Sequence, residues 1–83
     1  MIMIREGMVV KSIAGKDKGR YSVAVSCREG CVMICDGKHR RLASPKRKNP
    51  RHLEPTDEFA LDCINSDRAI RKLLRKYNFD KLN

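Results

Sequence analysis

Short segments that mix apolar and polar residues fill the first half of the chain. Residues 8–13 are rich in β-branched side chains and lie between Gly7 and Gly15, which predicts a strand. Residues 21–27 alternate valine with serine or alanine, in the period of two that a half-buried strand requires. The first segment lacks this strict alternation, so its pattern leaves open which of its faces points inward.

Two turn signals connect these segments into an antiparallel meander. Residues 28–30 end in glycine and precede the apolar residues 31–35, which is typical of a β-hairpin. Asp36 and Gly37 follow at once, and this dipeptide favours a type I′ turn. The sequence therefore predicts that residues 38–43 fold back as another antiparallel strand, one rich in positive charge.

Apolar periodicity weakens in the middle of the chain. Residues 44–50 consist largely of Pro, Lys, Arg and Asn, a composition that predicts a solvated loop. Residues 52–55 fit a short closing strand. Residues 56–65 fit either a turn of helix or irregular chain, although Thr56 is a suitable cap for a helix that starts at Asp57. We leave this last segment unassigned.

The pattern of the tail predicts an amphipathic helix over residues 67–77, about three turns long. Asn65 or Ser66 can cap it, and Asp67 suits the positive end of the helix dipole. We expect its apolar side to pack on the strands while its basic side is solvated. The apolar residues recur at positions i, i+3, i+4 and i+7: Ile70, Leu73, Leu74 and Tyr77.

These elements predict a mainly β fold, a small β-barrel followed by a C-terminal α-helix. The 83 residues suffice for one domain, with residues 1–56 as the barrel and residues 57–83 as a connector and the helix packed on it. A chain of this length buries only roughly 60% of the surface that its unfolded form exposes. It has little room for a deep apolar pocket, so we expect neither an enzyme nor a small-molecule substrate.

The charge of the chain is strongly positive and unevenly distributed. There are 19 Lys and Arg against 10 Asp and Glu, a formal net charge of +9. Residues 1–37 hold six basic and four acidic side chains, residues 38–52 hold seven basic and none acidic, and residues 53–83 hold six of each. Because the excess is concentrated in the middle segment rather than interspersed over the surface, we expect a polyanion as the partner.

Two stretches of the chain resemble a known family. GMVVKSIAGKDKGRYSVAV, followed by VMICDGKHRRLASPKRKNPRHLEPT, is similar to the KOW domain of archaeal and eukaryotic large-subunit ribosomal proteins and of their small bacterial relatives. The resemblance runs from about residue 7 to residue 56. It implies an SH3-like β-barrel that binds RNA, chiefly ribosomal RNA. The matching positions are Gly15, Lys16, Lys18, Gly19, Arg20, Asp36, Gly37, Arg40, Arg41 and residues 45–48 and 52–56.

The loop of residues 15–20 and the basic segment of residues 38–52 are the candidate RNA-binding elements. Glycines in the loop would let its backbone approach a phosphate, although an ordinary solvated turn has the same composition. Only three residues separate its glycines and Arg follows, so it is not a nucleotide-binding P-loop. The candidate phosphate contacts are Lys16, Lys18, Arg20, Arg40, Arg41, Lys46, Arg47, Lys48 and Arg51.

Aromatic side chains for base stacking are scarce. The chain has two Tyr, two Phe and no Trp, and among them only Tyr21 lies near the basic segments. We therefore expect recognition of the backbone and shape of a folded RNA, most of all large-subunit rRNA, rather than reading of single-stranded bases.

The cysteines raise the alternative of a metal site. Cys27 and Cys31 could face each other across the hairpin, with Cys35, His39 or Cys63 completing a soft-metal site. Three residues separate each successive pair, however, and no Cys-x-x-Cys knuckle is present, so we expect no metal. A redox switch has no support from the sequence either. Without an export signal the thiols should be reduced.

The sequence contains no catalytic constellation, and no apolar run approaches the length of about 18 residues that a membrane span needs. We expect a cytoplasmic RNA-binding protein that is ribosomal or associated with the ribosome, without cofactor or membrane contact, and with ribosomal proteins as further candidate partners. The alternative is a protein-interaction adaptor that docks a partner through the barrel edge or the C-terminal helix.

Overall fold

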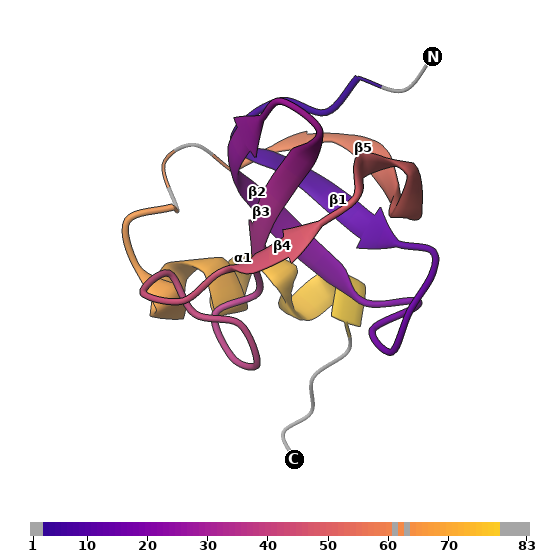
Figure 1. Cartoon of the computed structure of the whole chain (residues 1–83). Helices are drawn as coiled ribbons and strands as arrows, with labels where there is room; N and C mark the ends of the chain where they lie inside the picture. Colours follow the sequence, from indigo (N-terminus) through magenta and orange to yellow (C-terminus); the bar gives the residue numbers. More distant parts are fainter. Residues whose placement is uncertain (1–2, 61, 63, 79–83) are drawn as a thin grey trace.

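A five-stranded antiparallel sheet and one C-terminal helix form the described part of a computed structural model, which covers residues 3–60, 62 and 64–78 (Figure 1). The strand order is β4-β3-β2-β1-β5, and the ladder is not closed. This arrangement is mostly β and is consistent with a small SH3-like fold. The elements are β1 (Met8–Ser12), β2 (Tyr21–Arg28), β3 (Cys31–Cys35), β4 (Lys46–Lys48), the 3₁₀ turn η1 (Pro50–His52), β5 (Leu53–Phe59) and α1 (Asp67–Asn78).

Each face of the sheet carries a buried apolar cluster, which explains why the first strand shows no strict alternation. Val9 and Val10 are both fully buried, but they point to opposite faces of the pleated strand. One face forms a core within the curled sheet: Met8, Val10, Ala24, Val32, Ile34 and Leu53. The other face packs against α1: Val9, Val23, Cys35, Ala60, Ile70 and Leu74.

The β2–β3 hairpin confirms the first predicted turn. Arg28 pairs with Cys31, and the two residues between them include Gly30, whose φ of 79° suits glycine. The register shifts between Ala24 and Ser26, and a comparable shift occurs in the β1–β5 pair. Such irregularities bend a strand and increase its twist, which helps the sheet to curl around its inner core.

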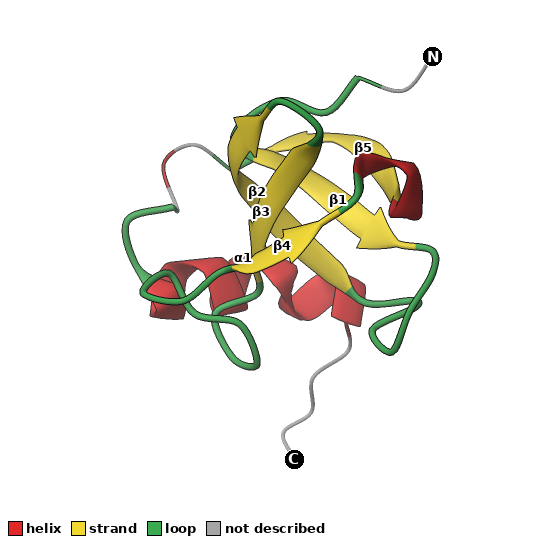
Figure 2. Ribbon diagram, viewed as in Figure 1, coloured by secondary structure: helices red, strands yellow, loops and turns green. Residues whose placement is uncertain are grey.

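The predicted strand over residues 38–43 is wrong. The predicted loop over residues 44–50 is wrong at residues 46–48, which form β4, and at Pro50, where η1 begins. The chain from residue 37 to residue 44 forms bends and turns, whereas β4 lies later and pairs with β3 (Figure 2). The reason is the side chain of Asp36. Its carboxylate accepts hydrogen bonds from the next backbone amides, so these amides are not available to a strand ladder.

The predicted closing strand is confirmed and is longer than expected. β5 begins at Leu53 and takes in Thr56, so the domain boundary placed at residue 56 falls inside a strand. Pro55 is tolerated because β5 is an edge strand of the described sheet. Its neighbour Thr56 donates its hydroxyl hydrogen to the Val9 carbonyl at 2.8 Å, which adds a contact between the two strands.

The predicted helix is confirmed within one residue, and its apolar stripe packs on the sheet as expected. Ile70 and Leu74 are buried against the outer face of the sheet, and α1 runs beneath the strands in Figure 1. Of the two candidate caps, Ser66 takes the role, since its hydroxyl accepts from the Ala69 amide at 3.2 Å. Within the described residues, no helix has the length and apolar character required to cross a membrane.

A group of polar contacts that the sequence did not predict fixes the C-terminal end of α1. The Asn78 side-chain amide bonds both backbone groups of Tyr21, accepting at 2.7 Å and donating at 3.1 Å. The rings of Tyr21 and Tyr77 stack with their centroids 4.6 Å apart. The Tyr77 hydroxyl also donates to Glu58, a bond that raises the pKa of Tyr77 to about 12. The C-terminal end of the helix is therefore held against β2 and β5.

Two glycine substitutions test the close approach of the loop to the helix. A Cβ at Gly37 would lie 2.3 Å from the Asp67 carbonyl oxygen, whereas a Cβ at Gly30 meets nothing within 4 Å. Both glycines have positive φ, so Gly30→Ala controls for backbone strain, which costs about 1–2 kcal/mol. We expect Gly37→Ala to lower the unfolding free energy by about 3 kcal/mol or more in urea titrations. Equal losses at the two sites would contradict this packing.

Candidate nucleic-acid interface

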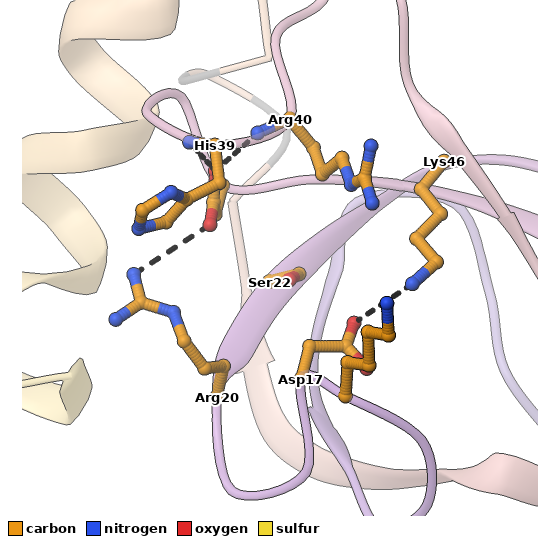
Figure 3. A pocket seen from close by; sticks show the side chains of 8 residues that line it. Asp17, Arg20, Ser22, His39, Arg40 and Lys46 are labelled. Carbon is orange, nitrogen blue, oxygen red and sulfur yellow. Dashed lines mark hydrogen bonds and ion pairs between the residues drawn. The ribbon is translucent and has the colours of Figure 1, made fainter.

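Two loops on the same side of the sheet enclose a pocket of about 440 Å³ (Figure 3). One is the β1–β2 loop, residues 13–20, and the other is the β3–β4 loop, residues 36–45. Ser22 lies on β2 between them (Figure 3). We refer to this feature as the loop pocket, and its lining is Lys16, Asp17, Arg20, Ser22, Asp36, His39, Arg40 and Lys46.

The β1–β2 loop is tied to the ends of its strands. The Ser12 amide donates to the Arg20 carbonyl at 2.9 Å, and the Gly19 amide donates to the Ser12 carbonyl at 2.7 Å. Gly15 has a φ of 90°, and a Cβ there would lie 3.2 Å from the ammonium nitrogen of Lys48. Gly15 therefore makes room for an internal lysine, a reason that the sequence did not reveal.

An internal ion pair holds this loop against β4. The Lys48 ammonium donates to Asp17 Oδ1 at 2.6 Å and to the Ala14 carbonyl at 2.9 Å, while Lys46 lies 3.8 Å from Asp17 Oδ2. Burial alone would raise the pKa of the Asp17 carboxyl, but the hydrogen bond and positive charge of Lys48, with the charge of Lys46, hold it below its ordinary value of 3.8. Asp17 is therefore the anionic centre of the loop.

Lys48 is placed inside the fold rather than on the surface. It lies opposite Val32 in the β3–β4 register, so its stem shares the face of the inner core, and only 6% of its side chain is exposed. Its ammonium group is engaged within the protein. We therefore leave Lys48 out of the surface that a phosphate can contact, although its charge still adds to the local field.

Asp36 organises the second loop. Its Oδ1 accepts backbone N–H bonds from Lys38, His39 and Arg40 at 2.9, 2.8 and 2.8 Å. Its Oδ2 lies 3.5 Å from the guanidinium of Arg20, which belongs to the other loop. Asp36 is only 5% exposed, so one buried carboxylate fixes the turn and links the two basic loops.

The start of α1 supports the β3–β4 loop from behind. Asp67 Oδ1 accepts from the Leu42 amide at 2.7 Å and from the Cys35 thiol at 3.7 Å. Arg71 donates to the Gly37 carbonyl at 3.4 Å. Burial is the main cause that raises the pKa of the Cys35 thiol to about 11, and the Asp67 carboxylate adds to it. Cys35 is consequently a structural thiol rather than a reactive one.

The structure brings four of the nine candidate phosphate contacts together in the loop pocket, namely Lys16, Arg20, Arg40 and Lys46. Arg47 is exposed on the opposite side of β4 from Lys46, because successive side chains of a strand alternate. The pocket also contains four residues that the sequence did not indicate as part of a site: Ser22, His39, Asp17 and Asp36. The other exposed candidates are Lys18, Arg41 and Arg51.

The cysteines do not face one another as the metal alternative required. Cys27 is paired with Val32 and is exposed, whereas Cys31 is paired with Arg28 and is buried. No group of three or more His, Cys, Asp or Glu side chains that could hold a metal occurs within residues 3–60, 62 and 64–78. Cys63, a further candidate ligand, lies outside the described residues.

Comparison with known proteins identifies no family for this chain. No family model matches the sequence, and a search of curated proteins finds no relative. The similarity to KOW domains therefore rests on the residues quoted above, and the site has to be interpreted from its own chemistry.

Removal of the Asp17 charge tests the internal ion pair. Asp17→Asn leaves the nearly buried Lys48 ammonium without its counter-charge, and we expect a loss of about 3 kcal/mol in unfolding free energy. Glu58→Gln is the matched control, because it removes the charge from the pair with the exposed Lys76 while its amide oxygen can still accept from the Tyr77 hydroxyl. It should cost about 1 kcal/mol or less. Urea titrations measure both, and equal losses would contradict the structural role of Asp17.

The same pair predicts a direction of pH dependence. Asp17 has a lower pKa in the folded protein than in the unfolded chain, so its contribution is complete above the unfolded value and is lost as pH falls through the folded value. The stability difference between the wild type and Asp17→Asn should be constant between about pH 5 and pH 8 and should shrink below about pH 4. A difference unchanged at about pH 2 would count against this assignment.

Proposed function

We propose that this protein binds RNA through the loop pocket and the exposed cations around it. The observation that carries the proposal is the state of the two carboxylates in the pocket. Asp17 is neutralised by two lysines, and Asp36 is buried under backbone amides and Arg20. What the surface offers to a partner is therefore the positive charge of both loops.

The positions of these cations suit a phosphate backbone. The pocket cations, with the exposed Lys18 and Arg41, come from the two loops and from the start of β4. The two loops are far apart in sequence but are joined by the contact of Asp36 with Arg20. Arginine can grip a phosphate bidentately, whereas lysine acts as a point charge. Cations of both types on one surface support contact with several phosphates of one folded RNA.

The aromatic residues support recognition of RNA shape rather than of bases. Tyr21, the aromatic residue closest in sequence to the basic loops, stacks on Tyr77 and lies against the end of α1. Its ring is occupied within the protein and is a poor platform for an unpaired base. Together with the resemblance to KOW domains, this favours ribosomal RNA of the large subunit as the partner of a ribosomal or ribosome-associated protein in the cytoplasm, acting by binding rather than catalysis.

The adaptor alternative loses one of its two surfaces. Ile70 and Leu74, which would have anchored a partner on the helix, are fully or almost fully buried by the sheet of the same chain. Leu73 is also packed against the apolar cluster between α1 and the sheet. The apolar stripe therefore serves the fold, and the observed surface favours RNA over a protein partner.

Two double charge reversals with the same change in net charge test the proposed surface. Arg40→Glu with Arg41→Glu should weaken RNA binding about 100-fold, since each lost phosphate contact is worth about tenfold. Lys72→Glu with Arg75→Glu on the exposed side of α1 is the matched control and should change affinity less than about threefold. Anisotropy titrations with an rRNA fragment measure both. Equal effects of the two pairs would show that only net charge matters.

The wild-type protein should also show a defined salt dependence. If about five side chains neutralise phosphates, the logarithm of affinity should fall with the logarithm of salt concentration with a slope near −3.5 to −4.5. Titrations at several salt concentrations measure the slope. A slope near zero would contradict binding through phosphates.

A further inference from the structure

The loop pocket is a recess, whereas contact with the backbone of an RNA requires only an exposed basic surface. Its cationic side chains come from three segments of the chain and line one cavity of about 440 Å³, within the range of pockets that hold small ligands. Four cations against two carboxylates give the lining a formal charge of +2. The residues that carry these charges are Lys16, Arg20, Arg40, Lys46, Asp17 and Asp36.

Ser22 gives the pocket a neutral polar group between the two loops. The residue is only 4% exposed, yet it lines the cavity (Figure 3). Its hydroxyl makes no hydrogen bond to any described residue, and a hydroxyl can donate to a phosphate oxygen. A ligand that reaches Ser22 has to project into the recess rather than lie across its rim.

We propose that the loop pocket binds the terminal phosphate of an RNA strand, a phosphomonoester, in preference to an internal phosphodiester. The inference rests on the proposed function, because it assigns one particular group of the RNA to the pocket. The remaining exposed cations then contact the backbone that follows the terminal phosphate.

Charge and shape both favour a terminal phosphate. A phosphomonoester carries a charge of about −1.5 to −2 at pH 7 and three acceptor oxygens, which matches a lining of +2 better than the single charge of a diester does. An internal phosphate is flanked by sugars on both sides, so the strand would have to kink to bring it to Ser22. A strand end can enter the recess without that distortion.

The experiment compares two short RNAs that differ only at the 5′ end, one with a phosphate and one with a hydroxyl. Each carries a dye at its 3′ end, and anisotropy gives its affinity for the full chain at physiological ionic strength. We expect the phosphorylated strand to bind about tenfold more tightly. The competitor is a nucleoside 5′-monophosphate, which offers the same phosphate without the strand.

Three variants assign any preference to the pocket. Arg40→Gln removes a lining charge, and Ser22→Ala removes the hydroxyl without altering net charge, so both should reduce the preference for the phosphorylated strand, to about twofold or less for Arg40→Gln. Arg41→Gln is the matched control, because Arg41 is exposed next to Arg40 but does not line the pocket. It should weaken both RNAs equally and keep the preference.

The outcomes separate this inference from the proposed function. A preference that Arg40→Gln and Ser22→Ala reduce and Arg41→Gln preserves supports the pocket as a site for a strand end. Equal binding of the two RNAs overturns the inference while RNA binding stands. Competition by the monophosphate as strong as that by the phosphorylated strand overturns an RNA end as the ligand, and no binding of either RNA overturns both proposals.

Discussion

The Asp36 carboxylate is the contact on which the geometry of the basic surface depends. One oxygen accepts three consecutive backbone amides, which folds the β3–β4 loop back on itself, and the other faces Arg20 across the pocket. A loop so rich in positive charge would otherwise repel itself and its neighbour. The buried anion offsets part of that repulsion and sets the spacing of the two loops.

Asp17 fixes the position of the β1–β2 loop, and its partner is Lys48. Its bond to Lys48 connects the β1–β2 loop to β4, an edge strand of only three residues. A lysine that points inward on an edge strand also discourages pairing with another chain. Lys48 thus covers the inner core with its stem, anchors the β1–β2 loop through Asp17 and discourages edge pairing of β4. These three roles explain why a basic side chain is buried in this fold.

The sequence predicted most of the strands and the helix, because alternation and helical periodicity depend on the side chains within each segment. It failed at residues 38–50, where tertiary contacts override local signals. Asp36 and Gly37 favour a hairpin turn in isolation, yet the Asp36 side chain competes for the backbone amides and Gly37 packs directly on Asp67. Neither contact leaves a pattern in the sequence.

The candidate site was predicted as a set of charges but not as an arrangement. Charge density identified the basic loops, because electrostatic attraction depends on composition. It could not separate Lys48 from Lys46, since only the folded chain brings the Lys48 ammonium to Asp17 and the Ala14 carbonyl and buries it. Nor could it find Ser22, a neutral residue within a strand that becomes part of the pocket only when two distant loops meet.

RNA binding through the two loops can be tested by ultraviolet crosslinking of the tagged protein in its native cells, with the attached RNA sequenced and the crosslinked residues mapped. We expect discrete rRNA positions of the large subunit, attached through the loops around residues 16–20 and 38–47. Crosslinks confined to the exposed side of α1, or no RNA above background, would contradict it.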